Sequence, residues 1–277
     1  MRAVRFVDSR GEARIGVLED TRVRDAGPAG PQGFVPTPEA WAALGTAAGP
    51  EYDLAGIRLL HPVVPEKILA IGVNYRSHAD ESELDVPQMP VVFAKWSSAL
   101  IGPDEDIVVP LEETRPDFEG EVAVVLGERV YRATDDEARS AIGGITAIHD
   151  VSGRRAQLET PLRQFTLGKS FDTFAPLGPA IASPDSVDLG RIGLRTTVSG
   201  EVMQEASTSD LVFGLADLIV YLSKGLTLEA GDVIATGTPG GVGDSRTPPR
   251  YLEEGDIVEV WVEGVGTLRN PVRRERL

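Results

Sequence analysis

Pro-Asp-Phe-Glu-Gly-Glu-Val-Ala-Val-Val-Leu-Gly, residues 116–127, has the pattern of a buried strand with glutamates at its start. The apolar run predicts a strand from Glu121 to Leu126. Because successive side chains of a strand point to opposite faces, Glu119 and Glu121 point the same way, about 7 Å apart along the backbone. The sequence therefore aims two like charges at one place beside a core strand.

A second apolar run, Gly-Gly-Ile-Thr-Ala-Ile-His at residues 143–149, ends in a third acid, Asp150. Carboxylates that converge at the edge of a core raise one another's pKa unless a cation lies between them. Three oxygen ligands with no cysteine suit Mg²⁺ or Mn²⁺ before zinc, with Ca²⁺ as a substitute ion in crystals. The alternative is that both glutamates form the solvated face of a strand and that Asp150 caps a turn.

The rest of the chain is rich in short strands and poor in helices. A Thr-x-x-Glu capping box at Thr134 predicts a helix to about Ile142, and weaker patterns predict helices over 209–222 and 76–84. Strands with few helices favour a β-dominated α+β domain with a rolled or sandwiched sheet. The further predicted strands are 68–73, 91–94, 144–149, 194–198, 233–236 and 257–262.

The first 60 residues differ in pattern from the remainder of the chain. Short alternating runs at 4–7 and 14–18 precede a Gly/Pro-rich stretch from Ala26 to Pro38, and Pro62 and Pro65 punctuate the chain after it. We expect a small β-rich domain over 1–62 and a larger second domain over 63–277, which the resemblance described below implies is the catalytic one.

Composition excludes several classes of protein. The 277 residues carry 27 Lys+Arg against 43 Asp+Glu, and this acidity disfavours nucleic acid and membrane surfaces as partners. The absence of cysteine rules out disulfides and thiolate metal sites. The charged first dozen residues do not resemble a signal peptide, so we expect a cytoplasmic protein.

Six motifs, in order over about residues 68–272, resemble those of the fumarylacetoacetate hydrolase family. The resemblance implies a mixed β-sandwich roll with a small N-terminal domain, a Mg²⁺ or Mn²⁺ ion on Glu119, Glu121 and Asp150, a homodimer, and a small 2-oxo or 2,4-dioxo acid as substrate. The motifs are GVNYRSHADE (72–81), FAKWSSALIGP (93–103), the Glu-x-Glu strand, HDVSGR (149–154), GKSFDTFAPLGP (168–179) and GDVIATGTPGGVG (231–243).

His78 and Glu81 are spaced as neighbours on a helical turn, where a carboxylate would orient an imidazole as a general base for water. In the family this pair lies on a segment that closes over the substrate. Without the resemblance, an exposed surface pair would be the simpler interpretation.

The resemblance also implies roles for several residues around the metal. Lys169 matches an active-site lysine suited to stabilising an enolate, although a surface lysine is the simpler interpretation. Substrate contacts are expected from Lys95, Arg154, Gln157 and Thr238. The loop over 237–243 has neither a dinucleotide nor a phosphate-loop fingerprint, so no nucleotide cofactor is expected.

Two departures from the family pattern stand beside Asp150. His149 replaces the usual Asn and is expected to face away from Asp150 as a structural residue. Arg155 replaces the usual Asp, and two adjacent arginines predict a site for a second anionic group on the substrate. The alternative is that Arg155 points outward and pairs with a surface acid.

These observations predict a metal-dependent hydrolase that cleaves a C–C bond in an acylpyruvate-like 2,4-dioxo acid. Water activated by His78 and Glu81 would attack the 4-carbonyl, and Lys169 would stabilise the departing enolate. An oxaloacetate decarboxylase or an isomerase or hydratase of 2-oxo acids would use the same site. A non-catalytic metal-binding member is a further alternative, against which the His78–Glu81 pair argues.

Overall fold

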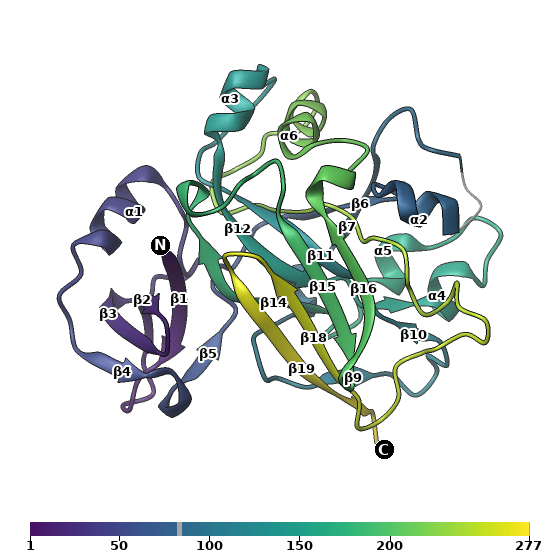
Figure 1. Cartoon of the computed structure of the whole chain (residues 1–277), viewed down its shortest axis with the longest axis horizontal. Coiled ribbons are helices and arrows are strands. Elements are labelled where there is room, and N and C mark those ends of the chain that lie inside the picture. Colours follow the sequence, from purple (N-terminus) through teal and green to yellow (C-terminus); the bar gives the residue numbers. More distant parts are fainter. Residues whose placement is uncertain (82–84, 277) are drawn as a thin grey trace.

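The computed structural model describes residues 1–81 and 85–276 (Figure 1). Its N-terminal part is a small antiparallel sheet with one helix, drawn in purple at the left of the figure. Helix α1 (Pro38–Gly45) is capped by the Thr37 side chain, which accepts a hydrogen bond from Ala40 N. The strands of this part are β1 (Arg2–Val7), β2 (Ala13–Glu19), β3 (Arg22–Pro28), β4 (Glu51–Asp53) and β5 (Arg58–Leu60).

The larger part is built on a sheet that continues from the N-terminal strands in the order β4-β3-β2-β1-β14-β12-β11-β17-β6-β7. Its centre is the antiparallel pair β11 and β12, whose side chains are buried along their whole length, as the apolar runs predict. The strands not yet bounded are β6 (Ile68–Gly72), β7 (Val91–Lys95), β8 (Leu100–Ile101), β11 (Gly120–Leu126), β12 (Ile142–His149), β14 (Ala175–Ala182) and β17 (Val233–Ala235).

A second sheet of five strands, in the order β16-β15-β18-β19-β9, packs against β11 and β12. The two sheets lie close together at Gly120, because a Cβ on this residue would lie 2.0 Å from Thr196 Oγ1 of β15. A side chain on residue 120 is therefore excluded by the second sheet. The strands are β9 (Ile107–Val109), β15 (Gly193–Val198), β16 (Glu201–Ser207), β18 (Ile257–Val262) and β19 (Gly266–Arg274); β10 (Pro116–Asp117) and β13 (Ser152–Gly153) form a separate pair.

Short helices lie around the edges of the sheets. Helix α3 (Asp135–Ser140) begins with the predicted capping box of Thr134 and Glu137. The helix predicted over 209–222 begins later, because the chain makes a single 3₁₀ turn before α6. The other helices are α2 (Arg76–Glu81), α4 (Arg154–Leu158), α5 (Phe165–Gly168) and α6 (Leu215–Ser223), and the 3₁₀ turns span Leu54–Gly56, Ser97–Ala99, Pro184–Ser186 and Thr208–Asp210.

The β-dominated α+β class is confirmed, and each predicted strand is present with its ends shifted by at most two residues. Among the strands of six or more residues, β3, β14, β16 and β19 were not predicted, and neither were the short strands β4, β5, β8, β9, β10 and β13. The helix predicted to Leu84 is described only to Glu81, and residues 82–84 lie outside the described part. None of the helices within 1–81 and 85–276 is long and apolar enough to cross a membrane.

The boundary at residue 62 stays a prediction. Hydrogen bonding crosses it, since β1 pairs with β14 at Arg2–Ala182 and Ala3–Ile181. The N-terminal strands and the larger part thus share one continuous sheet.

Candidate metal centre and active site

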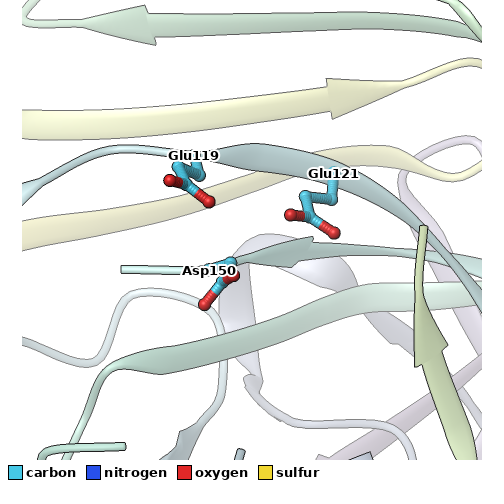
Figure 2. A group of neighbouring side chains, drawn as sticks. All are labelled: Glu119, Glu121 and Asp150. Carbon is cyan, nitrogen blue, oxygen red and sulfur yellow. The ribbon is translucent and has the colours of Figure 1, made fainter. Parts of the chain in front are cut away.

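Three carboxylates converge where β11 begins and β12 ends (Figure 2). Glu121 lies in β11 and Glu119 just before it, while Asp150 follows β12 and donates its backbone N–H to Glu119 O at 2.8 Å. One oxygen from each residue lies within 4.8 Å of the others, and all three residues are at least 96% buried. The antiparallel register therefore builds the cluster that the alternation of residues 119 and 121 predicts.

The cluster has the chemistry of a divalent-cation site. Burial, reinforced by Asp150 and then Glu119, raises the pKa of Glu121 well above its usual range. A cation held by the three oxygens would relieve that repulsion, and an all-oxygen donor set fits Mg²⁺ or Mn²⁺. Glu119, Glu121 and Asp150, here called the triad, thus have the ligand chemistry that the predicted Mg²⁺ or Mn²⁺ ion requires.

Two buried lysines lie against the triad. Lys169, which follows α5, donates from Nζ to Glu119 Oε2 and Asp150 Oδ2, both at 2.6 Å, and lies over the Phe93 ring. Lys95, at the end of β7, donates to Asp150 Oδ1 at 2.7 Å and to the carbonyl of Lys169. Lys169 is placed as the sequence predicts. Lys95 supports Asp150 and the backbone of Lys169, a role that was not predicted.

Arg154 and Gln157, both on α4, reach the triad but are engaged by protein groups. Arg154 donates from Nε to Asp117 Oδ2 at 2.8 Å, from Nη2 to Glu119 Oε1 at 2.5 Å and from Nη1 to Gln157 Oε1 at 3.0 Å. Although burial opposes it, Lys169 and then Arg154 hold the pKa of Glu119 well below its usual range. Lys169 and Arg154 together therefore favour the ionised form of Glu119.

The prediction that Arg155 joins the substrate site is not supported by its position. Its side chain is 40% exposed, forms an ion pair with Glu159 at 3.5 Å and donates to the carbonyl of Glu112. Neighbouring residues on a helix point about 100° apart, so Arg155 turns outward where Arg154 turns inward. This is the alternative that the sequence left open.

His78 and Glu81 lie on α2. This helix is bonded to the loop over residues 237–243, here called the glycine-rich loop. His78 Nδ1 is 3.8 Å from Glu81 Oε2, too long for a hydrogen bond, and that oxygen accepts from the backbone N–H of Gly241 at 2.9 Å. The same loop donates from Gly237 N to Glu121 Oε2, so α2 and the triad are bonded to one segment. The predicted pair is present, but Glu81 also ties α2 to the loop.

Among the buried polar atoms that have no hydrogen-bond partner within residues 1–81 and 85–276 are Tyr75 Oη, His78 Nδ1 and both ring nitrogens of His149. Burial, followed by the charge of Glu121, raises the pKa of the fully buried Tyr75. Because such atoms are costly to leave unpaired, a polar ligand bound at the triad would supply the partner that Tyr75 and His78 lack.

The glycine-rich loop is bonded to β11. Gly237 N donates to Glu121 Oε2 at 2.8 Å, and Thr238 Oγ1 donates to the carbonyl of Gly120 at 3.0 Å. The predicted Thr238 hydroxyl therefore lies at the site. Its proton is donated to the carbonyl of Gly120, the residue between Glu119 and Glu121.

Sequence reasoning missed two buried residues that hold this arrangement together. Asp117 accepts from Arg154 and from the backbone N–H groups of Gly243 and Asp244, and its spacing of two from Glu119 was a usable signal. Gln204 of β16 accepts from Gly120 N and donates to Thr238 Oγ1 and Pro239 O. Nothing in the local sequence around Gln204 indicates this role.

His149 pairs with Gly120 in the β11–β12 ladder and so faces the second sheet, as the alternation predicts. Burial, reinforced by Lys95, lowers the pKa of His149 to about 3, so the imidazole is neutral at pH 7.

Comparison with known proteins assigns this constellation to a family. The model of the fumarylacetoacetate (FAA) hydrolase C-terminal domain matches residues 67–273, most of the chain. The chain belongs to the fumarylacetoacetate hydrolase family. This match covers the three carboxylates and the two buried lysines.

Members of the family named for an activity are similar over most of this chain. The mitochondrial oxaloacetate tautomerase fahd2 of Xenopus laevis is 41% identical over 79% of this chain and 69% of its own length. A 5-carboxymethyl-2-hydroxymuconate delta-isomerase from Mycobacterium smegmatis is 34% identical, with a TM-score of 0.83 over 100% of both chains. The fumarylacetoacetate hydrolase of Exiguobacterium antarcticum is 34% identical, with a TM-score of 0.84 over 99% of this chain and 100% of its own.

Proposed function

We propose that this protein is a divalent-metal-dependent isomerase that interconverts the enol and keto forms of a 2-oxo acid with a second carboxylate. The activities for which the tautomerase and the delta-isomerase are named support this reaction class. The observation that carries the proposal is the pair of proton-handling side chains at the triad. Lys169 Nζ contacts Glu119 and Asp150, and His78 lies on α2, which Glu81 ties to the same glycine-rich loop that bonds Glu121.

The reaction requires one proton to leave carbon and another to be added to oxygen. A divalent ion bound to the triad would polarise the 2-oxo group. His78 takes a proton from the carbon next to that group and returns it in the reverse direction. Lys169 stabilises the negative charge that develops on the oxygen and supplies the proton that makes the enol.

The charges of the buried cluster favour an anionic substrate. Four buried acids, Asp117, Glu119, Glu121 and Asp150, face three buried cations, Lys95, Lys169 and Arg154. Adding a divalent cation to this set gives an excess of positive charge in a region of low dielectric. A carboxylate next to the reacting 2-oxo group would neutralise it, which is the chemistry of a 2-oxo acid.

The test is a tautomerisation assay on oxaloacetate. The enol form absorbs in the ultraviolet, and its conversion to the keto form is followed with Mg²⁺ or Mn²⁺ and with a chelator. We expect acceleration over buffer that the chelator removes. A wild-type protein that binds Mn²⁺ but leaves the rate at the buffer value would contradict the proposal.

Cleavage of a C–C bond in an acylpyruvate is the second candidate. His78 Nδ1, which has no partner in the described part of the chain, favours it, because an imidazole beside a carboxylate is suited to activating water. Assays of acetylpyruvate and fumarylpyruvate cleavage and of oxaloacetate decarboxylation, each with a chelator control, distinguish these activities. Failure of all of them would favour a metal-binding member without catalysis.

We further propose that Mg²⁺ or Mn²⁺ is the ion and that the chain forms a homodimer. Calorimetric titration of the metal-free protein with each ion tests the first statement. Analytical ultracentrifugation tests the second, and a single species of monomer mass over the working concentration range would contradict it.

A further inference from the structure

Gln204 connects the second sheet to the residue that separates the two metal glutamates. It lies in β16, is 1% exposed, and accepts a hydrogen bond at Oε1 from Gly120 N at 3.0 Å. Its Nε2 donates to Thr238 Oγ1 at 2.7 Å and to Pro239 O at 2.9 Å. Every hydrogen-bonding position of the amide nitrogen is thus used inside the protein.

The hydrogen bonds form a closed ring around the Gly120 backbone. Thr238, which accepts from Gln204, donates its own hydroxyl proton to the carbonyl of Gly120 at 3.0 Å. Both polar groups of Gly120 are therefore held, the N–H by Gln204 and the C=O by Thr238. Because residue 120 has no side chain of its own, these backbone hydrogen bonds fix its position.

The position of Gly120 determines where the neighbouring carboxylates point. Glu119 and Glu121 are bonded to it on either side, so a rotation of its peptide groups would move both glutamates together. A divalent ion such as Mg²⁺ demands near-ideal coordination geometry, and groups that orient its ligands contribute to its affinity.

We propose that Gln204 is a positioning residue of the metal centre, which acts on Glu119 and Glu121 through the Gly120 backbone and on the loop through Thr238. The inference rests on the proposed function only in taking the triad as a metal site. It requires no particular reaction, so the two are tested separately.

The test is calorimetric titration of metal-free variants with Mn²⁺. Gln204→Met keeps the length of the side chain and removes all three hydrogen bonds, while Thr238→Val removes the hydroxyl. We expect each to weaken Mn²⁺ binding by about tenfold or more, the scale for loss of groups that orient metal ligands. Thr238→Ser keeps the hydroxyl and should bind Mn²⁺ nearly as tightly as the wild type.

The double variant Gln204→Met/Thr238→Val tests whether both residues act through one ring. We expect the double variant to bind Mn²⁺ as weakly as whichever single variant binds it less tightly. Each single substitution already breaks the ring of hydrogen bonds around Gly120, so the second one adds little. Losses that multiply would mean that the two residues act independently and would overturn the ring.

The matched control is Asn270→Leu in β19. Asn270 is also a buried amide that donates to two backbone carbonyls, those of Gly102 and Glu105, both at 2.9 Å. We expect it to lower the melting temperature without changing Mn²⁺ affinity. Equal losses of affinity in Gln204→Met and Asn270→Leu would reduce the effect to general destabilisation and overturn the proposal.

Unchanged Mn²⁺ affinity in Gln204→Met, or a wild type that binds no Mn²⁺, would also overturn it. If Gln204→Met does not fold, the comparison of Thr238→Val with Thr238→Ser decides, since these variants differ mainly in one hydroxyl. A wild type that binds Mn²⁺ but does not tautomerise oxaloacetate removes the proposed function and leaves this test intact.

Discussion

Glu81 Oε2 accepts a hydrogen bond from the backbone N–H of Gly241 at 2.9 Å, so the helix that carries His78 is fastened to the glycine-rich loop. The neighbouring Ser77 accepts from Gly240 N at 3.2 Å in the same way. Glu81 therefore takes part in two interactions: its hydrogen bond with Gly241 positions α2, and its carboxylate lies beside the His78 imidazole.

Substituting Glu81 by Gln or by Ala separates these two interactions. Gln keeps an oxygen for Gly241 N but removes the charge beside His78, whereas Ala removes both. We expect both variants to lose turnover, and only Glu81→Ala to lose amide protection over 76–81 in hydrogen exchange. Equal protection in the two variants would show that the bond to Gly241 does not hold the helix.

Asp150→Asn should weaken Mn²⁺ binding strongly while the protein remains folded. The substitution removes one of three converging charges and also relieves their repulsion in the metal-free protein. Calorimetry measures the affinity, and the control is Asp232→Asn, a buried acid that instead pairs with Lys67. Unchanged Mn²⁺ affinity in Asp150→Asn would contradict the assignment of the triad.

His78→Ala should leave Mn²⁺ affinity nearly unchanged and lower turnover by about a hundredfold or more, the scale for loss of a general base. Loss of CO₂ from oxaloacetate needs no base, so decarboxylation should suffer less than tautomerisation or hydrolysis. Rates are compared at saturating substrate. Equal losses in all activities would mean that His78 positions the substrate generally.

Arg154 and Arg155 should respond very differently to substitution. Arg155→Ala breaks only a surface pair with Glu159, so KM for fumarylpyruvate or oxaloacetate should change by less than about twofold. Arg154→Ala leaves the buried Asp117 without its cation and Glu119 with Lys169 alone, and should cost metal affinity and stability together. A selective rise in KM for dianionic substrates in Arg155→Ala would restore Arg155 to the substrate site.

The segment between the glycine-rich loop and β18 should lose stability in acid through Asp256. Although burial opposes it, hydrogen bonds from Glu253 N, Arg250 and Ser199 lower the pKa of Asp256. A lowered pKa in the folded state contributes stability above the unfolded pKa of about 4, and this is lost as the pH falls through the folded value. Asp256→Asn should therefore lower the melting temperature at pH 7 and have a smaller effect near pH 3. An equal effect at both pH values would contradict this role.

Local sequence determined the central strands and the direction of the two glutamates. The apolar run 122–126 and the alternation of residues 119 and 121 act over neighbouring residues, so the burial of β11 and the shared direction of both glutamates follow without knowledge of the rest of the chain. The capping box at Thr134 is equally local and begins α3 where it predicts. Asp150 stood out because it ends the second apolar run, and the family motifs added Lys169 and His78, which periodicity alone leaves as ordinary polar residues.

Only the tertiary structure decided which partner each buried charge has. Arg154 and Arg155 are adjacent and chemically identical, yet one is buried between Asp117 and Glu119 and the other pairs with Glu159 at the surface. Lys95, predicted as a substrate contact, instead bonds Asp150 and the Lys169 backbone. Gln204 reaches Gly120 from a strand 84 residues away in sequence. The free energy of a buried charge or amide depends on the groups that packing brings to it, and those groups come from elements that are distant in the chain.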